Sequence, residues 1–197
     1  IKFSVGGFSF KCASATATAP LEGGTAPVVT FSPAYANCGI GFLGISAEVI
    51  PGSCGYAVHS LGETGAHAFS AQLDIACPAE GAILIVVKKF PGTKTNCLIH
   101  IHPQANLGPV KVTDMTEASP ENFTITTELE SVEAVVTNGE EKCLISPGTY
   151  KNAKITGTTT VTSTVGGGGE TPPVKGKAKV AKVEKIHFQY ETEKVNV

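Results

Sequence analysis

The stretch His67-Ala68-Phe69-Ser70-Ala71-Gln72-Leu73-Asp74-Ile75 decides the fold class of this chain. Apolar and more polar residues alternate along it, so that Phe69, Leu73 and Ile75 fall on one face of an extended segment. Alternation with a period of two is typical of a β-strand that buries one of its faces. The stretch therefore predicts a strand that lies against an apolar core.

Similar runs recur along the chain. Asn122–Glu130 alternates in the same way, and a second strand, Val132–Thr137, follows after one serine. Gly81–Lys89 is apolar through its centre, which predicts a strand buried on both faces. Turn-forming pairs separate the runs, and helical periodicity is nearly absent. We therefore expect an all-β fold, an antiparallel sandwich or barrel-like domain with disulfides and an extended C-terminal β arm.

The N-terminal segment Ile1–Phe10 also has strand character, with Gly6-Gly7 in its middle. Ile1, Phe3 and Val5 point one way, whereas Phe8 and Phe10 resume on the opposite parity. A pair of glycines where a strand changes parity predicts a β-bulge.

Composition excludes two classes of function. The chain has 197 residues and a net charge of −2, and all 15 basic residues are lysine. A weakly acidic chain without arginine is poorly suited to nucleic-acid binding, which uses a basic patch and guanidinium groups. The longest apolar run, 82–87, is far shorter than the ~20 residues of a membrane span. We expect neither a nucleic-acid partner nor a membrane-spanning segment.

The cysteines indicate an oxidising compartment. None of the six is spaced C-x-x-C, which disfavours a zinc ribbon or a thioredoxin-type site. An even number scattered along a β-rich chain predicts three disulfides, and the first residue, Ile1, fits a processed N-terminus. We favour sequential pairing of the six: Cys12 with Cys38, Cys54 with Cys77, and Cys97 with Cys143. We therefore expect a secreted protein of the extracellular cell surface.

The composition changes at Gly166–Pro173, which predicts a linker between a domain at 1–165 and an arm at 174–197. The arm has a charge of about +3 and the rest of the chain about −5. Alternating apolar residues follow the arm, and those expected to contact another subunit are Val180, Val183, Ile186, Phe188 and Tyr190.

Two interpretations of the arm stay open. It is the last strand or hairpin of its own sheet, or it pairs with the open sheet edge of a neighbouring subunit. Strand addition between subunits supplies main-chain hydrogen bonds, and alternate side-chain pockets set its register. Head-to-tail contacts that do not close produce a fibre.

Several cysteine-centred segments resemble one group of proteins. They are Cys97–Leu107, Phe10–Cys12, Asn37–Gly39 and Gly52–Tyr56, together with the Gly-Thr-Tyr segment within Pro147–Gly157. These segments resemble secreted six-cysteine β proteins that are predicted in actinobacterial genomes and have no assigned activity. The resemblance covers about residues 8–165. It implies export and disulfides, and it implies no catalytic residues.

Candidate chemistry is sparse. His100 and His102 share a strand face and could ligate a metal with His59 or His67, although a solvent-facing pair is the simpler interpretation. The Gly-x-Ser-x-Gly motif is absent. We therefore expect no catalytic residues, no metal and no cofactor.

The expected function is that of an exported, non-enzymatic structural subunit of a cell-surface filament or layer. In this interpretation the partner is the chain itself, through strand exchange between subunits, with a surface glycan as a possible further ligand. The alternative is a secreted monomeric binding module for a glycan or a protein.

Overall fold

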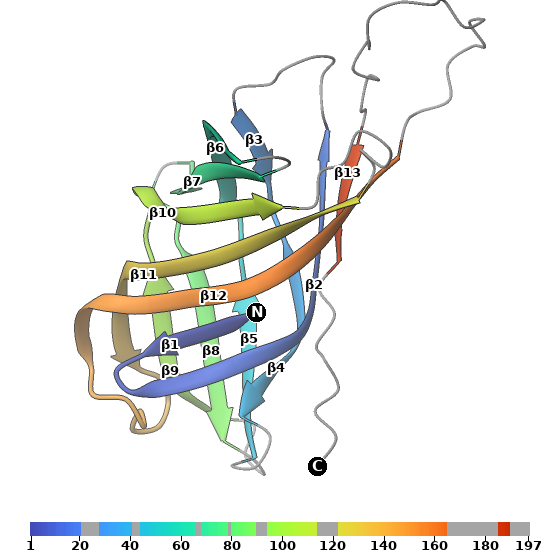
Figure 1. Cartoon of the computed structure of the whole chain (residues 1–197). Coiled ribbons are helices and arrows are strands. Elements are labelled where there is room, and N and C mark those ends of the chain that lie inside the picture. The colour runs from blue at the N-terminus through green and yellow to red at the C-terminus, as the bar shows by residue number, and fades with distance from the viewer. Residues whose placement is uncertain are drawn as a thin grey trace, which may run out of the picture.

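The computed structural model describes residues 1–20, 28–40, 44–65, 68–78, 80–89, 94–113, 122–164 and 185–189, and its regular elements are all strands (Figure 1). In chain order these are β1 Lys2–Val5, β2 Phe8–Pro20, β3 Val28–Phe31, β4 Ala34–Ile40, β5 Ile45–Ile50, β6 Gly55–Gly65, β7 Ala68–Ala76, β8 Ile83–Lys89, β9 Thr95–Ile101, β10 Gln104–Thr113, β11 Asn122–Asn138, β12 Gly148–Thr164 and β13 Lys185–Gln189. Among the described residues, the structure contains no helix that could serve as a transmembrane segment.

Eight of the strands close into an antiparallel barrel. Around the ring they follow the order β1, β2, β4, β5, β8, β9, β11, β12, and β12 pairs again with β1. As far as the described residues go, closure gives each of these eight strands a paired neighbour on both sides. The all-β prediction is confirmed, and of the two architectures that it left open the barrel is the observed one.

A second half of the sheet rises above the barrel in Figure 1. The long strands β11 and β12 continue past the ring, and β10, β7, β6 and β3 follow from β11 in that order. On the other side, β13 lies between β12 and the upper part of β2. β11 and β12 therefore belong to both halves, and their pairing continues from one half into the other.

The core follows the alternation of the strands. Ile83, Ile85, Ile99 and Ile101 point inward from β8 and β9 and are buried. Leu84 and Val86, on the other face of β8, are only half-buried. The prediction that this strand is buried on both faces is therefore wrong for the single chain, because its outer face forms part of the barrel wall.

The N-terminal segment forms a hairpin and not a bulged strand. Gly6 (φ 56°) and Gly7 (φ 83°) form a two-residue turn, with Val5 paired to Phe8. A turn of this kind needs positive φ at both central residues, which glycine adopts without a steric penalty. The change of parity thus marks a reversal of the chain, after which Phe3 and Phe10 stack on the same buried face.

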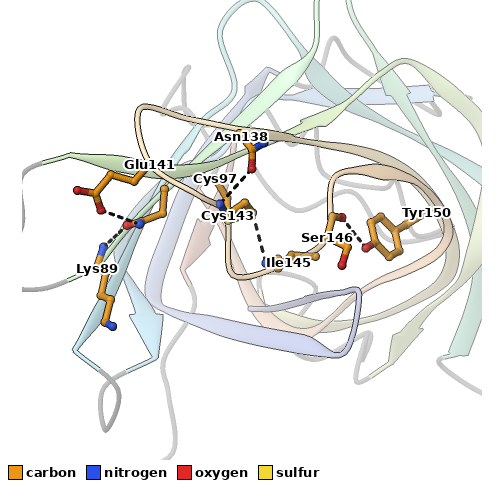
Figure 2. Close-up of a disulfide and its surroundings, with 9 residues drawn as sticks. Lys89, Cys97, Asn138, Glu141, Cys143, Ile145, Ser146 and Tyr150 are labelled. Atoms are coloured by element: carbon orange, nitrogen blue, oxygen red, sulfur yellow. Dashed lines mark hydrogen bonds between the residues drawn. A yellow bond between two sulfur atoms is a disulfide. The ribbon is translucent and has the colours of Figure 1, made fainter.

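Three disulfides staple the structure, in the sequential pairing that we favoured: Cys12–Cys38, Cys54–Cys77 and Cys97–Cys143. They indicate an oxidising, extracellular environment. The third bridge holds the connection between β11 and β12 against one end of the barrel (Figure 2). There the Asn138 side-chain oxygen accepts a hydrogen bond from Cys143 N (3.1 Å), and Ile145 is buried.

Candidate functional site

The strands β12 and β2 separate in the upper half, and β13 occupies the slot between them. β13 pairs antiparallel with both neighbours, with His187 opposite Thr162 on β12 and opposite Thr18 on β2. β13 is thus paired along both of its edges, and it covers the edges that β12 and β2 turn toward each other. We call this feature the slot, defined by residues 160–164 of β12 and 16–20 of β2.

The N-terminal strand fills the lower part of the same gap. β1 pairs with residues 154–156 of β12 and with residues 8–11 of β2. Because β1 and β13 are both antiparallel to β12, they run in the same direction, one below the other. The barrel half is therefore completed by a strand continuous with its own hairpin, and the upper half by a strand from the distant C-terminal arm.

The connection to β13 is long for the distance that it spans. Thr164 and Lys185 are register partners on adjacent antiparallel strands, yet twenty residues, 165–184, separate them in the sequence. Adjacent antiparallel strands are usually joined by about two to five residues. Connections longer than about 12–15 residues are uncommon inside a domain, and they are usually either functional loops or linker segments. The arm therefore has much more connecting chain than its position in this sheet requires.

Two of the residues predicted to contact another subunit lie on β13. Ile186 is the register partner of Ala19 and Ser163, and Phe188 is the register partner of Ala17 and Val161. Val180, Val183 and Tyr190, like the predicted linker 166–173, lie outside the described residues. On β2, Ala17 within the slot is buried, as is Ala15 just outside it.

The sequence predicted the alternating arm and its apolar positions, but not the strands that receive it. The two strands that flank the slot are more than 100 residues apart in the chain, and no local pattern marks such a pairing.

The histidine pair lies on the outside of the barrel. His100 and His102 stack with ring centroids 6.3 Å apart. Partial burial, and to a lesser extent the positive charge of His102 when protonated, lowers the pKa of His100 below 6.5. Of the third ligands considered for this pair, His67 lies outside the described residues and His59 is engaged elsewhere.

His59 pairs with Asp74 on the neighbouring strand, at 2.8 Å between Nε2 and Oδ2. The other oxygen of Asp74 accepts a hydrogen bond from Asn106 N (2.7 Å), which holds β10 against β7 at an irregular point of their register. Among the described residues, no hydroxyl or thiol hydrogen-bonds to the His59 ring. The pair therefore links β6 to β7. No described contact gives His59 a hydroxyl or thiol that it could activate as a general base.

Neither a metal centre nor a reactive thiol is found in the described part of the chain. No group of three or more His, Cys, Asp or Glu side chains there could hold a metal ion. All six cysteines are in disulfides, so none is available as a thiolate.

Gln104 joins the two halves at the point where β11 changes partners. Its side-chain amide donates to Glu133 O (2.8 Å), and its side-chain oxygen accepts from Glu133 N (2.6 Å). The amide thus takes the place of a strand residue between the β9 and β10 pairings of β11. Sequence reasoning did not single out this residue, because one glutamine carries no pattern.

A shallow cleft of about 360 Å³ lies beside the Cys54–Cys77 bridge, lined by Thr30, Phe31, Ser32, Ser53, Gly55, Tyr56 and Ala76. Its described lining is of hydroxyl, aromatic and small groups, and Ser32 Oγ is already bonded to Cys54 O at 2.8 Å. A binding module would use a surface of this kind, but no carboxylate or amide side chain of the described residues lines it to orient a sugar.

Comparison of this chain with protein-family models, with curated proteins and with solved structures finds no match. The assignment of a function therefore rests on the geometry of the chain itself.

Proposed function

We propose that this chain is an exported, non-enzymatic structural subunit that assembles by strand exchange, with the arm of one copy entering the slot of the next. The observation that carries the proposal is the separation of Thr164 and Lys185 by twenty residues although they are register partners. If β13 served only its own sheet, a short turn between Thr164 and Lys185 would be enough to connect it to β12.

The connection is long enough to reach a second copy. At ~3.3 Å per residue, twenty extended residues span roughly 65 Å. A compact domain of this size has a radius of gyration of about 15 Å, and hence a diameter of about 40 Å. A connector containing five glycines and two prolines favours an extended reach over a tight turn. The arm of one copy can therefore enter the slot of another without displacing its own body.

The slot offers an incoming strand a complete set of main-chain partners. β13 pairs with both β12 and β2 over the five residues Lys185–Gln189. Affinity in strand addition comes from these main-chain hydrogen bonds, and specificity comes from alternate side chains. The position of Phe188 opposite the buried Ala17 supports Phe188 as the residue that sets the register.

The charges of the two parts assist the encounter. The arm is positive and the rest of the chain negative, so an arm is attracted to the body of another copy. A contact between the arm of one copy and the slot of the next is heterologous. Unless its rotation closes a ring, it propagates into a filament. Three disulfides suit a subunit that must last outside the cell, where thiols are oxidised.

Three forms of the protein test the proposal by negative-stain microscopy and size-exclusion chromatography. The full chain is expected to form filaments, and a chain lacking residues 174–197 is expected to stay folded without assembling. In the third form an Asn-Gly turn replaces residues 165–184, so that β13 can reach only its own slot. We expect this short-turn form to be a stable monomer.

Two outcomes would contradict the proposal. If the full chain is a monodisperse monomer, and deletion of 174–197 unfolds it, the arm is the last strand of its own sheet. Assembly of the short-turn form into filaments would also contradict strand exchange, because its arm cannot leave its own body.

A further inference from the structure

In the single chain the slot is filled by the chain's own arm. β13, the five residues Lys185–Gln189, pairs with β12 along one edge and with β2 along the other (Figure 1). Adjacent strands lie about 4.8 Å apart, so a strand between β12 and β2 holds them roughly 10 Å apart and leaves room for no second one. Below β13 the same gap is taken by β1, which also pairs with both β12 and β2. An arm from another copy therefore finds the slot free only after the chain's own arm has left it.

The closed ring of the barrel does not include β13. The ring passes from β12 to β1 and from β1 to β2, so both flanking strands stay paired in the barrel without the arm. β13 has only five residues and belongs to the C-terminal part of the chain. Short segments near the end of a chain open locally at a much lower free energy than core strands. The arm can therefore leave the slot while the barrel stays folded.

We propose that the arm of each chain blocks its own slot, so that a single chain is held in a closed, non-assembling form until this arm is released. This control acts on the slot of the proposed function and rests on that function. The blocking strand and the incoming strand need the same main-chain partners, residues 160–164 of β12 and 16–20 of β2. The two occupancies exclude each other, and release of the own arm precedes each addition to a filament.

The connector favours the own arm over arms of other copies in dilute solution. Thr164 and Lys185 are register partners joined by twenty residues. Twenty residues of random coil have an r.m.s. end-to-end distance of about 25 Å, and a linker of this kind holds its end at an effective concentration on the order of 1 mM. In a solution of chains at about 1 µM, arms of other copies are roughly a thousandfold less concentrated. The slot of a dilute chain is therefore filled by its own arm.

The test is the binding of a fluorescently labelled peptide of residues 174–197 to the full chain at micromolar concentration, followed by fluorescence anisotropy. In the variant His187→Pro the own arm is weakened, because proline donates no main-chain hydrogen bond and is excluded from a strand that is paired on both sides. His187 lies at the centre of β13, opposite Thr162 and Thr18. The matched control is Thr171→Pro, which adds a proline to the connector and leaves β13 unchanged.

We expect His187→Pro to bind the peptide at least about a hundredfold more tightly than the wild type, because the peptide no longer competes with a tethered arm. Thr171→Pro is expected to bind the peptide as weakly as the wild type. If the wild type binds the peptide as tightly as His187→Pro, the own arm does not block the slot and the inference is overturned, whereas entry of an arm from outside is supported. If a folded His187→Pro does not bind the peptide, the slot accepts no arm from outside, and the proposed function fails together with the control that rests on it.

Hydrogen exchange of the dilute, monomeric wild-type chain tests the same inference without a variant, and so covers the case in which His187→Pro does not fold. The amides of β13 are expected to be protected, but less so than those of β9, Thr95–Ile101, in the barrel. Exchange of the β13 amides as fast as in the free peptide 174–197 would show that the own arm does not fill the slot. Exchange of β13 and β9 at one common rate would show that the arm is released only when the barrel unfolds. Either result would overturn the inference.

Discussion

We predict that alanine at Gly6 and alanine at Gly7 lower the free energy of unfolding by different amounts. A Cβ added at Gly6 would lie 2.5 Å from Ile145 Cγ2, whereas a Cβ at Gly7 would meet nothing within 4 Å. Both residues have positive φ, so alanine at either position costs about 1–2 kcal/mol in backbone conformation. At Gly6 the overpacking against Ile145 adds about 1–3 kcal/mol. We expect Gly6→Ala to lower the free energy of unfolding by about 2–5 kcal/mol and Gly7→Ala by about 1–2 kcal/mol.

Urea unfolding followed by near-UV circular dichroism measures both variants, since the chain has four tyrosines and no tryptophan. Any gain from stiffening the unfolded chain is common to both and cancels in the difference. In an Ile145→Ala background, the excess cost of Gly6→Ala is expected to disappear. Equal losses for the two variants, or an excess that survives Ile145→Ala, would refute the account of the hairpin packed against the closed end of the barrel.

Three further predictions concern stability. Replacing Cys97 and Cys143 by alanine opens a loop with a sequence separation of 46 and is expected to cost about 4 kcal/mol, measured by urea unfolding; a loss under ~1 kcal/mol would contradict it. Gln104→Leu leaves the backbone N–H and C=O of Glu133 without their amide partner and is expected to cost about 1–3 kcal/mol, with hydrogen exchange at the amide of Glu133 reporting the loss. Because burial lowers the pKa of His100, the unfolded chain takes up this proton more readily, so stability falls as the pH drops below 6.5. His100→Gln is expected to reduce this fall between about pH 7 and pH 5, and an unchanged slope would show that His100 does not contribute.

Sequence patterns predicted much of the fold because the apolar face of each strand is a local property. The alternation of His67–Ile75 corresponds to β7, Ala68–Ala76, with Leu73 and Ile75 buried. Changes of parity were harder to interpret, because a turn and a bulge both shift the alternation by one residue. At Gly6-Gly7 the shift marks a turn, although it suggested a bulge.

Near Ser131 the opposite error occurred, because one continuous strand was interpreted as two. The runs Asn122–Glu130 and Val132–Thr137 were expected as separate strands, yet both belong to β11, with irregular register between Leu129 and Ala134. Parity alone does not show whether the chain reverses or continues. The pairing partner decides this, and it lies far away in the sequence.

In the candidate site, too, the local pattern could be predicted from the sequence and the pairing partners could not. The apolar positions of the arm could be read from its alternation, and Ile186 and Phe188 do lie on a strand. The slot that receives them depends on β2 and β12, which only the closed fold brings together. The excess length of the connector became visible only once the register of Thr164 with Lys185 was known.

The most direct test of strand exchange uses two single-cysteine variants, Thr162→Cys and His187→Cys. These positions are register partners, and paired Cα atoms about 4.5–5.5 Å apart suit a disulfide. The two variants are unfolded together in denaturant with their native bridges intact, refolded as a mixture and mildly oxidised. Thr162→Cys mixed with Gln189→Cys, which is out of register, is the control.

If the arm of one copy enters the slot of another, a non-reducing gel of the first mixture shows a cross-linked dimer that the control mixture lacks. The double variant Thr162→Cys/His187→Cys then gives a ladder of linked chains. If the arm stays in its own sheet, the first mixture shows no cross-linked dimer and the double variant runs as a bridged monomer, which would contradict the proposed assembly.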